Sequence, residues 1–166
     1  MNVPAPSLRL LVCGNADRGD DGAALCAVAH VLPQLDLPTR QRLEVRRCLQ
    51  LDATDLVDVA PGEACLILDT VVGVEPGEVV DLTLDELATR ATIAPRSSHA
   101  LPIAQVLGIA REVRGGLPGG QFIGIGGKWF GFGAVRSRAL RDGMPAYERA
   151  IATAIAELVA ARPVSR

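Results

Sequence analysis

The sequence predicts a single α/β domain in three layers, with a mostly parallel five-stranded sheet between helices on both faces. Three observations support this prediction. The length of 166 residues suits one domain spanning 1–166. The composition, 49% hydrophobic and 22% charged, is ordinary for a globular protein. Apolar runs of strand length alternate with segments of helical length, as is typical of a parallel sheet covered by helices.

The first half of the chain contains three strand signals. The run LRLLVC ends at Gly14, as a buried strand would, and the run ACLILD is the strongest strand signal because small and apolar residues lead to one carboxylate. The expected strands are 8–13, 43–48 and 64–69, and the expected helices are 23–32, stopped by Pro33, and 52–59, closed by Pro61 and Gly62.

The second half adds two strands and three helices. Thr83 and Glu86 fit a capping box at the start of a short helix. Ser97 or Ser98 is expected to cap a longer helix, and Pro145 is expected to open the last one. The expected strands are 78–82, at an edge, and 121–125; the expected helices are 83–90, 97–114 and 145–162.

Composition excludes several classes of function. A formal net charge of −2 argues against a nucleic-acid partner. No apolar run approaches the roughly 18 residues of a membrane span. The first residues lack the pattern of a secretory signal, so a cytoplasmic location is expected. The four cysteines form no CxxC pair, which favours reduced thiols over disulfides or a cysteine metal site.

The loop GNADRGDDG follows the first predicted strand, where ligands bind in such folds. It lacks the glycine spacing of a dinucleotide site, and its carboxylates would repel a phosphate. It suits a cation or acid–base chemistry instead. Asp20 and Asp21 can equally complement a helix N-terminus, so both interpretations of the pair stay open.

Two further residues are candidates for chemistry. Asp69 ends the third predicted strand, either as a turn residue or as a carboxylate beside the first loop. His99 follows two serines at a predicted helix start, where a protonated imidazole is disfavoured and a neutral ligand or base is natural. Two carboxylates and one imidazole would leave open positions on zinc, nickel or cadmium. Serine catalysis has weaker support because no G-x-S-x-G is present.

These motifs, in this order, resemble the [NiFe]-hydrogenase maturation proteases. The resemblance rests on GNADRGDDG, LILDTVVG and SSHALPIAQVL, and it extends from Leu8 to about Arg162. It implies one α/β domain and an endopeptidase that removes the C-terminal tail of a hydrogenase large-subunit precursor after nickel insertion. By this resemblance Asp21, Asp69 and His99 contact the nickel, which the substrate supplies, and the protease has no metal cofactor of its own.

The resemblance also implies a mechanism. The three residues would complete the coordination of nickel held by the substrate, so that an empty precursor is not cut. The ion would polarise the scissile carbonyl or activate a water, with one aspartate as general base, which gives an aspartyl type of endopeptidase. Two alternatives remain: a non-catalytic, nickel-sensing chaperone of the precursor, and a nucleotide-binding flavodoxin-like module.

The sequence departs from the family pattern in two places. One glycine is missing from the G-x-G-N that usually closes the first strand, since the chain has VCGN, and no D-G-G-T-x-G follows the second. Segment 126–133 has no counterpart in that pattern. It sets Trp129, Phe130 and Phe132 among glycines, which indicates either an exposed contact surface for the precursor or a plug under the last helix.

Overall fold

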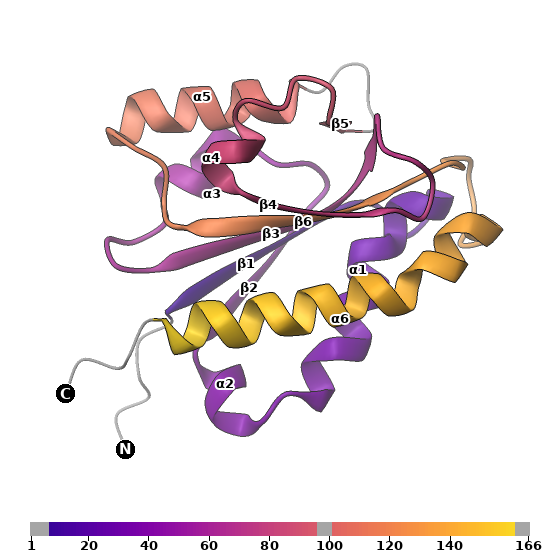
Figure 1. The fold of residues 1–166 in the computed structure, drawn as a ribbon, viewed down its shortest axis with the longest axis horizontal. Coiled ribbons are helices and arrows are strands. Elements are labelled where there is room, and N and C mark those ends of the chain that lie inside the picture. Colours follow the sequence, from indigo (N-terminus) through magenta and orange to yellow (C-terminus); the bar gives the residue numbers. More distant parts are fainter. Residues whose placement is uncertain (1–6, 96–100, 162–166) are drawn as a thin grey trace.

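A computed structural model describes residues 7–95 and 101–161, and Figure 1 shows helices above and below a central sheet. The sheet has the order β2-β1-β3-β6-β4, in which the first four strands run parallel and β4 is antiparallel to β6; β5 pairs with the end of β3. The strands are β1 (Leu8–Cys13), β2 (Leu43–Cys48), β3 (Ala64–Val72), β4 (Val79–Thr83), β5 (Ala94–Pro95) and β6 (Gly120–Gly126).

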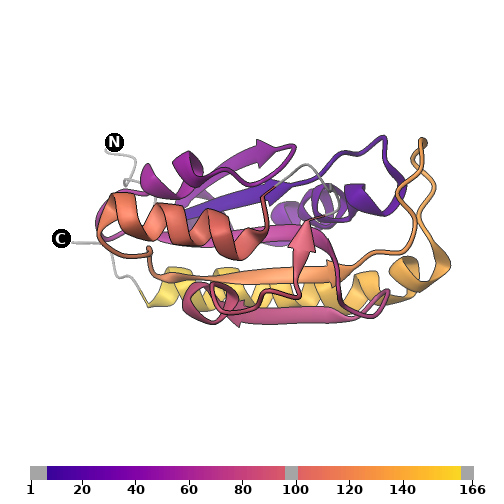
Figure 2. The same cartoon turned by 90° about the horizontal axis from the view of Figure 1, so that it is seen from above.

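Alternate residues of the central strands pack into two separate apolar cores. Leu10 and Leu66 face the core that is covered by α1 and α6, whereas Leu11 and Ile67 face the core covered by α3, α4 and α5. Figure 2, turned by 90°, separates α5 from α6 across the sheet. The helices are α1 (Ala23–Val31), α2 (Leu37–Gln41), α3 (Ala53–Val57), α4 (Leu84–Leu87), α5 (Ile103–Arg114) and α6 (Arg138–Ala160), with 3₁₀ turns η1 (Gly19–Gly22) and η2 (Leu32–Gln34).

The predicted fold class is confirmed, and so are the five main strands. All of β1 and nearly all of β3 are buried, whereas β2 is partly exposed at the edge. The capping box at Thr83 and Glu86 forms as predicted. Strand β5 was not predicted, because it has only two residues and owes its form to pairing with Val71 and Val72.

Two predicted helix starts were wrong. Helix α6 begins at Arg138, because the Ser137 hydroxyl accepts a hydrogen bond from Leu140 N–H and Leu140 packs into the core; Pro145 is exposed inside the helix. Helix α5 begins at Ile103, not at Ser97 or Ser98, because Pro102 disfavours a helical conformation for the residue before it. Those two serines lie outside the described residues.

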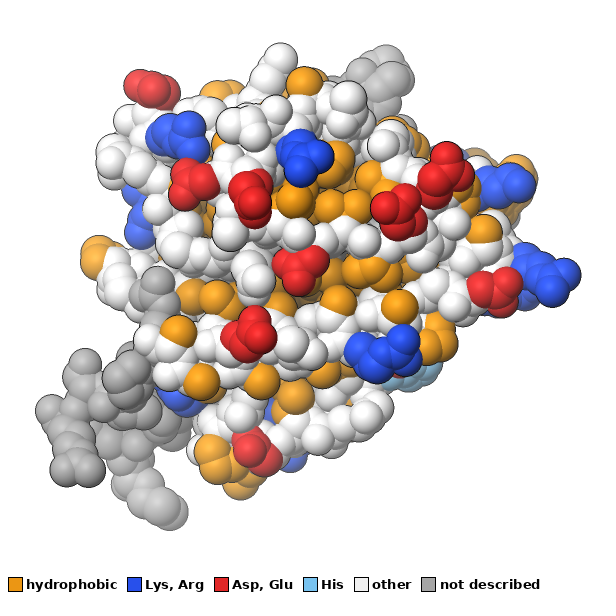
Figure 3. Space-filling view, viewed as in Figure 1, with side chains coloured by type: hydrophobic (Ala, Val, Ile, Leu, Met, Phe, Trp, Pro, Cys, Tyr) orange, Lys and Arg blue, Asp and Glu red, His pale blue; other side chains and the backbone are white. Residues whose placement is uncertain are grey.

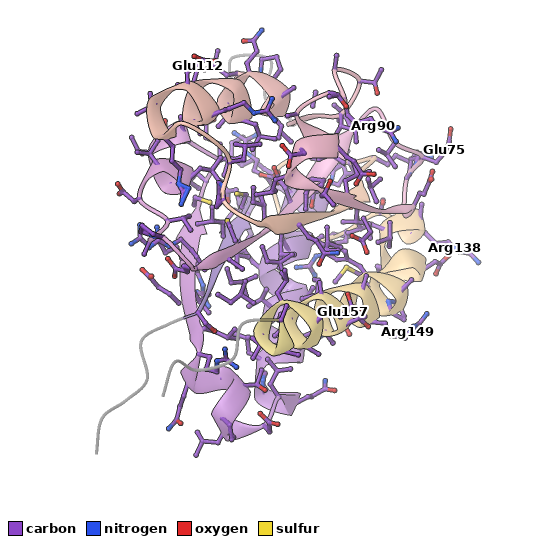
Figure 4. All side chains as sticks on the ribbon, turned by 60° about the vertical axis from the view of Figure 1, so that its left-hand side comes forward. Glu75, Arg90, Glu112, Arg138, Arg149 and Glu157 are labelled. Atoms are coloured by element: carbon purple, nitrogen blue, oxygen red, sulfur yellow. The ribbon has the colours of Figure 1, made fainter. Side chains whose placement is uncertain are left out.

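Within the part of the chain that the structure describes, five charged residues are buried, namely Arg9, Asp20, Asp21, Glu63 and Asp69, and other charged side chains extend from the surface. Figure 4 shows Glu112 extending outward from α5 and Arg149 from α6, and both are exposed. On the face drawn in Figure 3, acidic and basic side chains are interspersed among hydrophobic ones, so this face has no patch of a single sign. In residues 7–95 and 101–161, no helix has the length and apolarity that crossing a bilayer requires.

Candidate active site at the carboxyl edge of the sheet

The candidate site lies where β1 and β3 end side by side. The last residue pair between these strands is Val12 with Leu68, so Asp69 is the first residue of β3 beyond it. The loop after β1 returns to the same place, since the Thr70 hydroxyl donates to the carbonyl oxygen of Asp20 at 2.9 Å. The chain neighbours of Asp21 and Asp69 are therefore hydrogen-bonded to each other across the edge of the sheet.

Asp21 is held in η1 with its side chain buried. Its Oδ2 accepts a hydrogen bond of 3.0 Å from the backbone N–H of Asn15. This turn passes so close to the strand end that a Cβ at Gly14 would lie 2.1 Å from the Asp21 carbonyl oxygen, and Gly14 has φ of +130°. Only glycine fits at this position without a shift of the turn that holds Asp21.

Asp69 is also buried, and the main chain around it is supported from below. Its Oδ1 accepts from Thr70 N–H at 2.8 Å. The hydroxyl of Tyr147, fully buried on α6, lies 3.4 Å from the Asp69 carbonyl oxygen and 3.3 Å from that of Ile123. Helix α6 thus contacts the backbone of β3 and β6 directly beneath the candidate site.

The electrostatic field at this edge disfavours further negative charge. Burial, together with the negative charge of Asp69, raises the pKa of the Tyr147 hydroxyl well above its ordinary value. The pKa of the Cys13 thiol is raised in the same direction by its contact with Cys48 (2.8 Å between the sulfurs), by burial and by Asp69. All four cysteines are free thiols, as predicted. Burial and the Asp69 charge are thus causes shared by both shifts.

The hydrogen bonds of Asp20 give it a role that neither sequence interpretation of the Asp20–Asp21 pair had proposed. Its carboxylate accepts from Lys128 N–H at 2.8 Å, Trp129 N–H at 2.9 Å, and both the N–H and hydroxyl of Ser137, at 2.6 and 2.7 Å. Burial alone would raise the pKa of Asp20, but these hydrogen bonds outweigh it and lower the pKa. Asp20 anchors the segment before α6 to the loop after β1. Sequence reasoning missed Ser137, whose only signal is that serine favours helix N-caps.

Segment 126–133 forms an exposed surface beside this loop. Trp129 is 52% exposed and Phe132 is 80% exposed, so for these two the plug interpretation was wrong. The guanidinium of Arg18 lies 3.6 Å from the centre of the Phe132 ring, a cation–π contact. Gly19 N–H donates to Gly133 O at 2.8 Å, which joins the two segments through their backbones.

The structure brings two of the three predicted site residues to one edge. Asp21 and Asp69 both lie there, and His99 lies outside the described residues. Among residues 7–95 and 101–161, no group of three His, Cys, Asp or Glu side chains could hold a metal ion.

No family model matches the sequence, and no curated protein matches it. Solved structures do resemble the chain. The hydrogenase maturating endopeptidase HybD from E. coli has a TM-score of 0.70 at 20% identity, covering 90% of this chain and 92% of that one. The [NiFe] hydrogenase maturation protease HybD from Thermococcus kodakarensis has a TM-score of 0.58 at 23% identity, covering 88% and 97%.

A third structure, a solution structure of an endopeptidase from Escherichia coli, has a TM-score of 0.66 at 21% identity, covering 90% and 93%. The class defined by the architecture is therefore a single α/β domain with acidic residues at the carboxyl edge of its sheet. More particularly, the chain has the fold of proteins named hydrogenase maturation endopeptidases.

Proposed function

We propose that this protein is an endopeptidase of hydrogenase maturation, which removes the C-terminal tail of a nickel-loaded [NiFe]-hydrogenase large-subunit precursor. The observation that supports the proposal is that the turn holding Asp21 is hydrogen-bonded to β3 next to Asp69, through Thr70 and the Asp20 carbonyl, in a fold shared along nine-tenths of the chain with named maturation endopeptidases. The cytoplasm, where such a precursor would be processed, is the proposed location.

The proposed substrate determines what these residues do. Nickel arrives bound to the precursor, and Asp21, Asp69 and His99 supply two oxygen ligands and one nitrogen ligand, a set that zinc or cadmium would also accept. A precursor without the metal offers these residues nothing to bind. Because both carboxylates are buried, their attraction for a cation is weakly screened by water.

The chemical step is peptide hydrolysis. Nickel polarises the scissile carbonyl or lowers the pKa of a water, and one of the two aspartates takes a proton from that water as general base. The hydroxide adds to the carbonyl carbon, the peptide C–N bond breaks, and the proton passes to the leaving amine. The tail and the shortened subunit are the products.

The test is mass analysis of a nickel-loaded large-subunit precursor before and after incubation with the protein. We expect the wild type to shorten the precursor, and Asp69→Asn and His99→Ala to lose at least about a hundredfold in rate. Asp58→Asn and His30→Ala are matched controls, since both side chains are exposed outside the site, and they should cut normally.

Two outcomes would contradict the proposal. Full tail removal by both site variants would show that these residues are not the catalytic set. Binding of the precursor by the wild type without any change in its mass would instead favour a non-catalytic chaperone that senses nickel.

A further inference from the structure

A second feature of the carboxyl edge is a pocket of about 540 Å³ on the α1 side of the loop that carries Asp21. Gly14 and Gly22 border it on the loop side, Leu25 and Cys26 come from α1, and Leu49 comes from the chain after β2. The Leu49 side chain is 76% exposed. The volume is within the range of pockets that bind small ligands or short peptide segments, and most of these side chains are apolar.

Two arginines give this apolar pocket a positive charge. Arg47 lines it, is exposed and forms no ion pair within the described part of the chain. Arg136 lines it as well, and its Nε is buried with no hydrogen-bond partner among the described residues; its Nη2 reaches the Gly22 carbonyl only at 3.5 Å. No Asp or Glu is among the lining residues.

Apolar walls beside two arginines indicate the chemistry of a ligand that would fit this pocket. A buried guanidinium N–H without an acceptor costs free energy that a ligand oxygen would recover. A carboxylate matches the guanidinium fork and forms strong, charge-assisted hydrogen bonds with it. The apolar walls beside it match an aliphatic side chain. A ligand that carries both groups next to each other would satisfy the whole pocket.

We propose that this pocket is a specificity subsite for the polypeptide substrate, and that it binds an aliphatic residue followed by an acidic one. The inference rests on the proposed endopeptidase function, because that function makes the occupant a polypeptide. Gly14 and Gly22 line the pocket and flank the turn that holds Asp21, so a segment seated in the pocket lies against the loop that carries the proposed catalytic acid. The subsite would fix the register of the precursor relative to Asp21 and Asp69.

The test uses two blocked pentapeptides, acetyl-Ala-Ala-Leu-Glu-Ala-amide and the same peptide with Gln in place of Glu. Each is titrated into the isotope-labelled full chain, and the amide shifts of Gly22, Ala29 and Leu49 are followed by nuclear magnetic resonance. We expect the Glu peptide to shift these amides and to bind about tenfold more tightly than the Gln peptide, which corresponds to about 1.4 kcal/mol. Equal binding of the two peptides would overturn the proposal. The absence of shifts with either peptide at about 10 mM, a concentration at which even weak binding is detected, would overturn it as well.

Variants assign the effect to the arginines. Arg47→Gln and Arg136→Gln should each reduce the preference for Glu to less than about threefold, whereas Arg136→Lys, which retains the charge, should keep part of it. Arg40→Gln is the matched control, because Arg40 lies on α2, which precedes β2, and is not among the residues that line the pocket. This variant should keep the full preference for Glu. A preference that survives in both glutamine variants would contradict the assignment.

The peptide titration requires neither nickel nor cleavage, so its result is separate from the test of the proposed function. If the wild type cuts the precursor but binds both peptides equally, the subsite proposal is wrong and the proposed endopeptidase function stands. If the wild type prefers the Glu peptide but never cuts the precursor, the pocket binds peptides as proposed and the proposed endopeptidase function is wrong.

Discussion

The Asp20 carboxylate concentrates four hydrogen bonds in one buried position, which makes it the most sensitive structural residue near the site. Replacement by Asn leaves donors from Lys128, Trp129 or Ser137 facing an amide NH₂ group. We expect Asp20→Asn to lower the free energy of unfolding by about 3 kcal/mol, measured by urea denaturation at pH 7. Ser137→Ala, which removes one of the four donors, should cost about 1 kcal/mol.

Asp20 also makes the stability of the fold fall at acidic pH. The folded-state pKa of Asp20 is below its ordinary value of 3.8, so its ionised form stabilises the fold fully above that value. The stabilisation is lost as the pH falls through the lower, folded-state pKa. The wild type should therefore lose stability below about pH 4 more steeply than Asp20→Asn. Parallel acid curves for the two proteins would contradict the anchor role.

The thiols differ in reactivity because they differ in burial. Burial raises the pKa of Cys65 to about 12, and the pKa of Cys13 is also raised, so neither forms a thiolate near neutral pH. Cys26 and Cys48 are partly exposed. Alkylation of the folded protein with iodoacetamide at pH 8, followed by peptide mass analysis, should label these two and spare Cys13 and Cys65.

Modification of Cys65 at a rate similar to that of Cys26 would contradict this order, because it would show that the strand opens readily to solvent. The same reaction in urea is the control, and all four cysteines should then react.

At the residue scale, the sequence could locate acids but could not assign their roles. The position of Asp21 and Asp69 follows from a local rule, since residues just after parallel strands gather at one edge. The anchor role of Asp20 depends on Ser137, which lies 117 positions away in the chain. No local pattern contains that contact, so only the family resemblance, and not the local sequence, distinguished Asp21 from Asp20.

At the element scale, the errors have a common physical origin. A proline is compatible with the first turn of a helix, and that preference placed the start of the last helix at Pro145. Tertiary contacts begin α6 seven residues earlier, through the Ser137 cap and burial of Leu140. Pro145 is exposed inside this helix, where it removes one backbone hydrogen-bond donor. Strands β1 and β3 were predicted closely because burial on both faces leaves an apolar run in the sequence.

Segment 126–133 presents exposed aromatic surface beside the loop after β1. Trp129 and Phe132 are exposed, and Phe132 contacts Arg18 in the loop that leads to Asp21; the backbone N–H of Trp129 donates to Asp20. We expect Trp129→Ala to raise KM for the nickel-loaded precursor about tenfold and to change kcat less than about twofold, because exposed Trp side chains often dominate protein contacts.

Leu37→Ala is the matched control for this variant. Leu37 is 58% exposed and begins α2, at the edge of the sheet away from the candidate site, so KM should not change. If Trp129→Ala lowered kcat and left KM unchanged, segment 126–133 would act on the catalytic groups and not on docking.

At the scale of the whole molecule, strand order determines which loops can cooperate. The alternation of strands and helices predicts the parallel sheet, but the order β2-β1-β3-β6-β4 is decided by which apolar faces pack together. That order sets β1 beside β3 and so brings Asp21 and Asp69 to one place. A chain with the same elements and β1 at the edge would separate these carboxylates.

We expect the fold to be stable without any bound metal ion. Two apolar cores, one on each face of the sheet, supply the burial that stabilises the fold. We therefore expect treatment with a chelator to leave the thermal midpoint unchanged within about 1 °C. Added nickel should raise it, since a ligand that binds only the folded state at 100 times its Kd stabilises by about 2.7 kcal/mol.

Scanning calorimetry of the wild type and Asp69→Asn, with and without nickel, separates the possible results. The increase caused by nickel should be lost in Asp69→Asn and kept in Asp58→Asn, because only the first change removes a buried carboxylate at the carboxyl edge. A midpoint that falls on chelation would mean that a resident metal supports the fold. The protein would then bring its own ion to the reaction, and nickel in the precursor could no longer be what licenses cleavage.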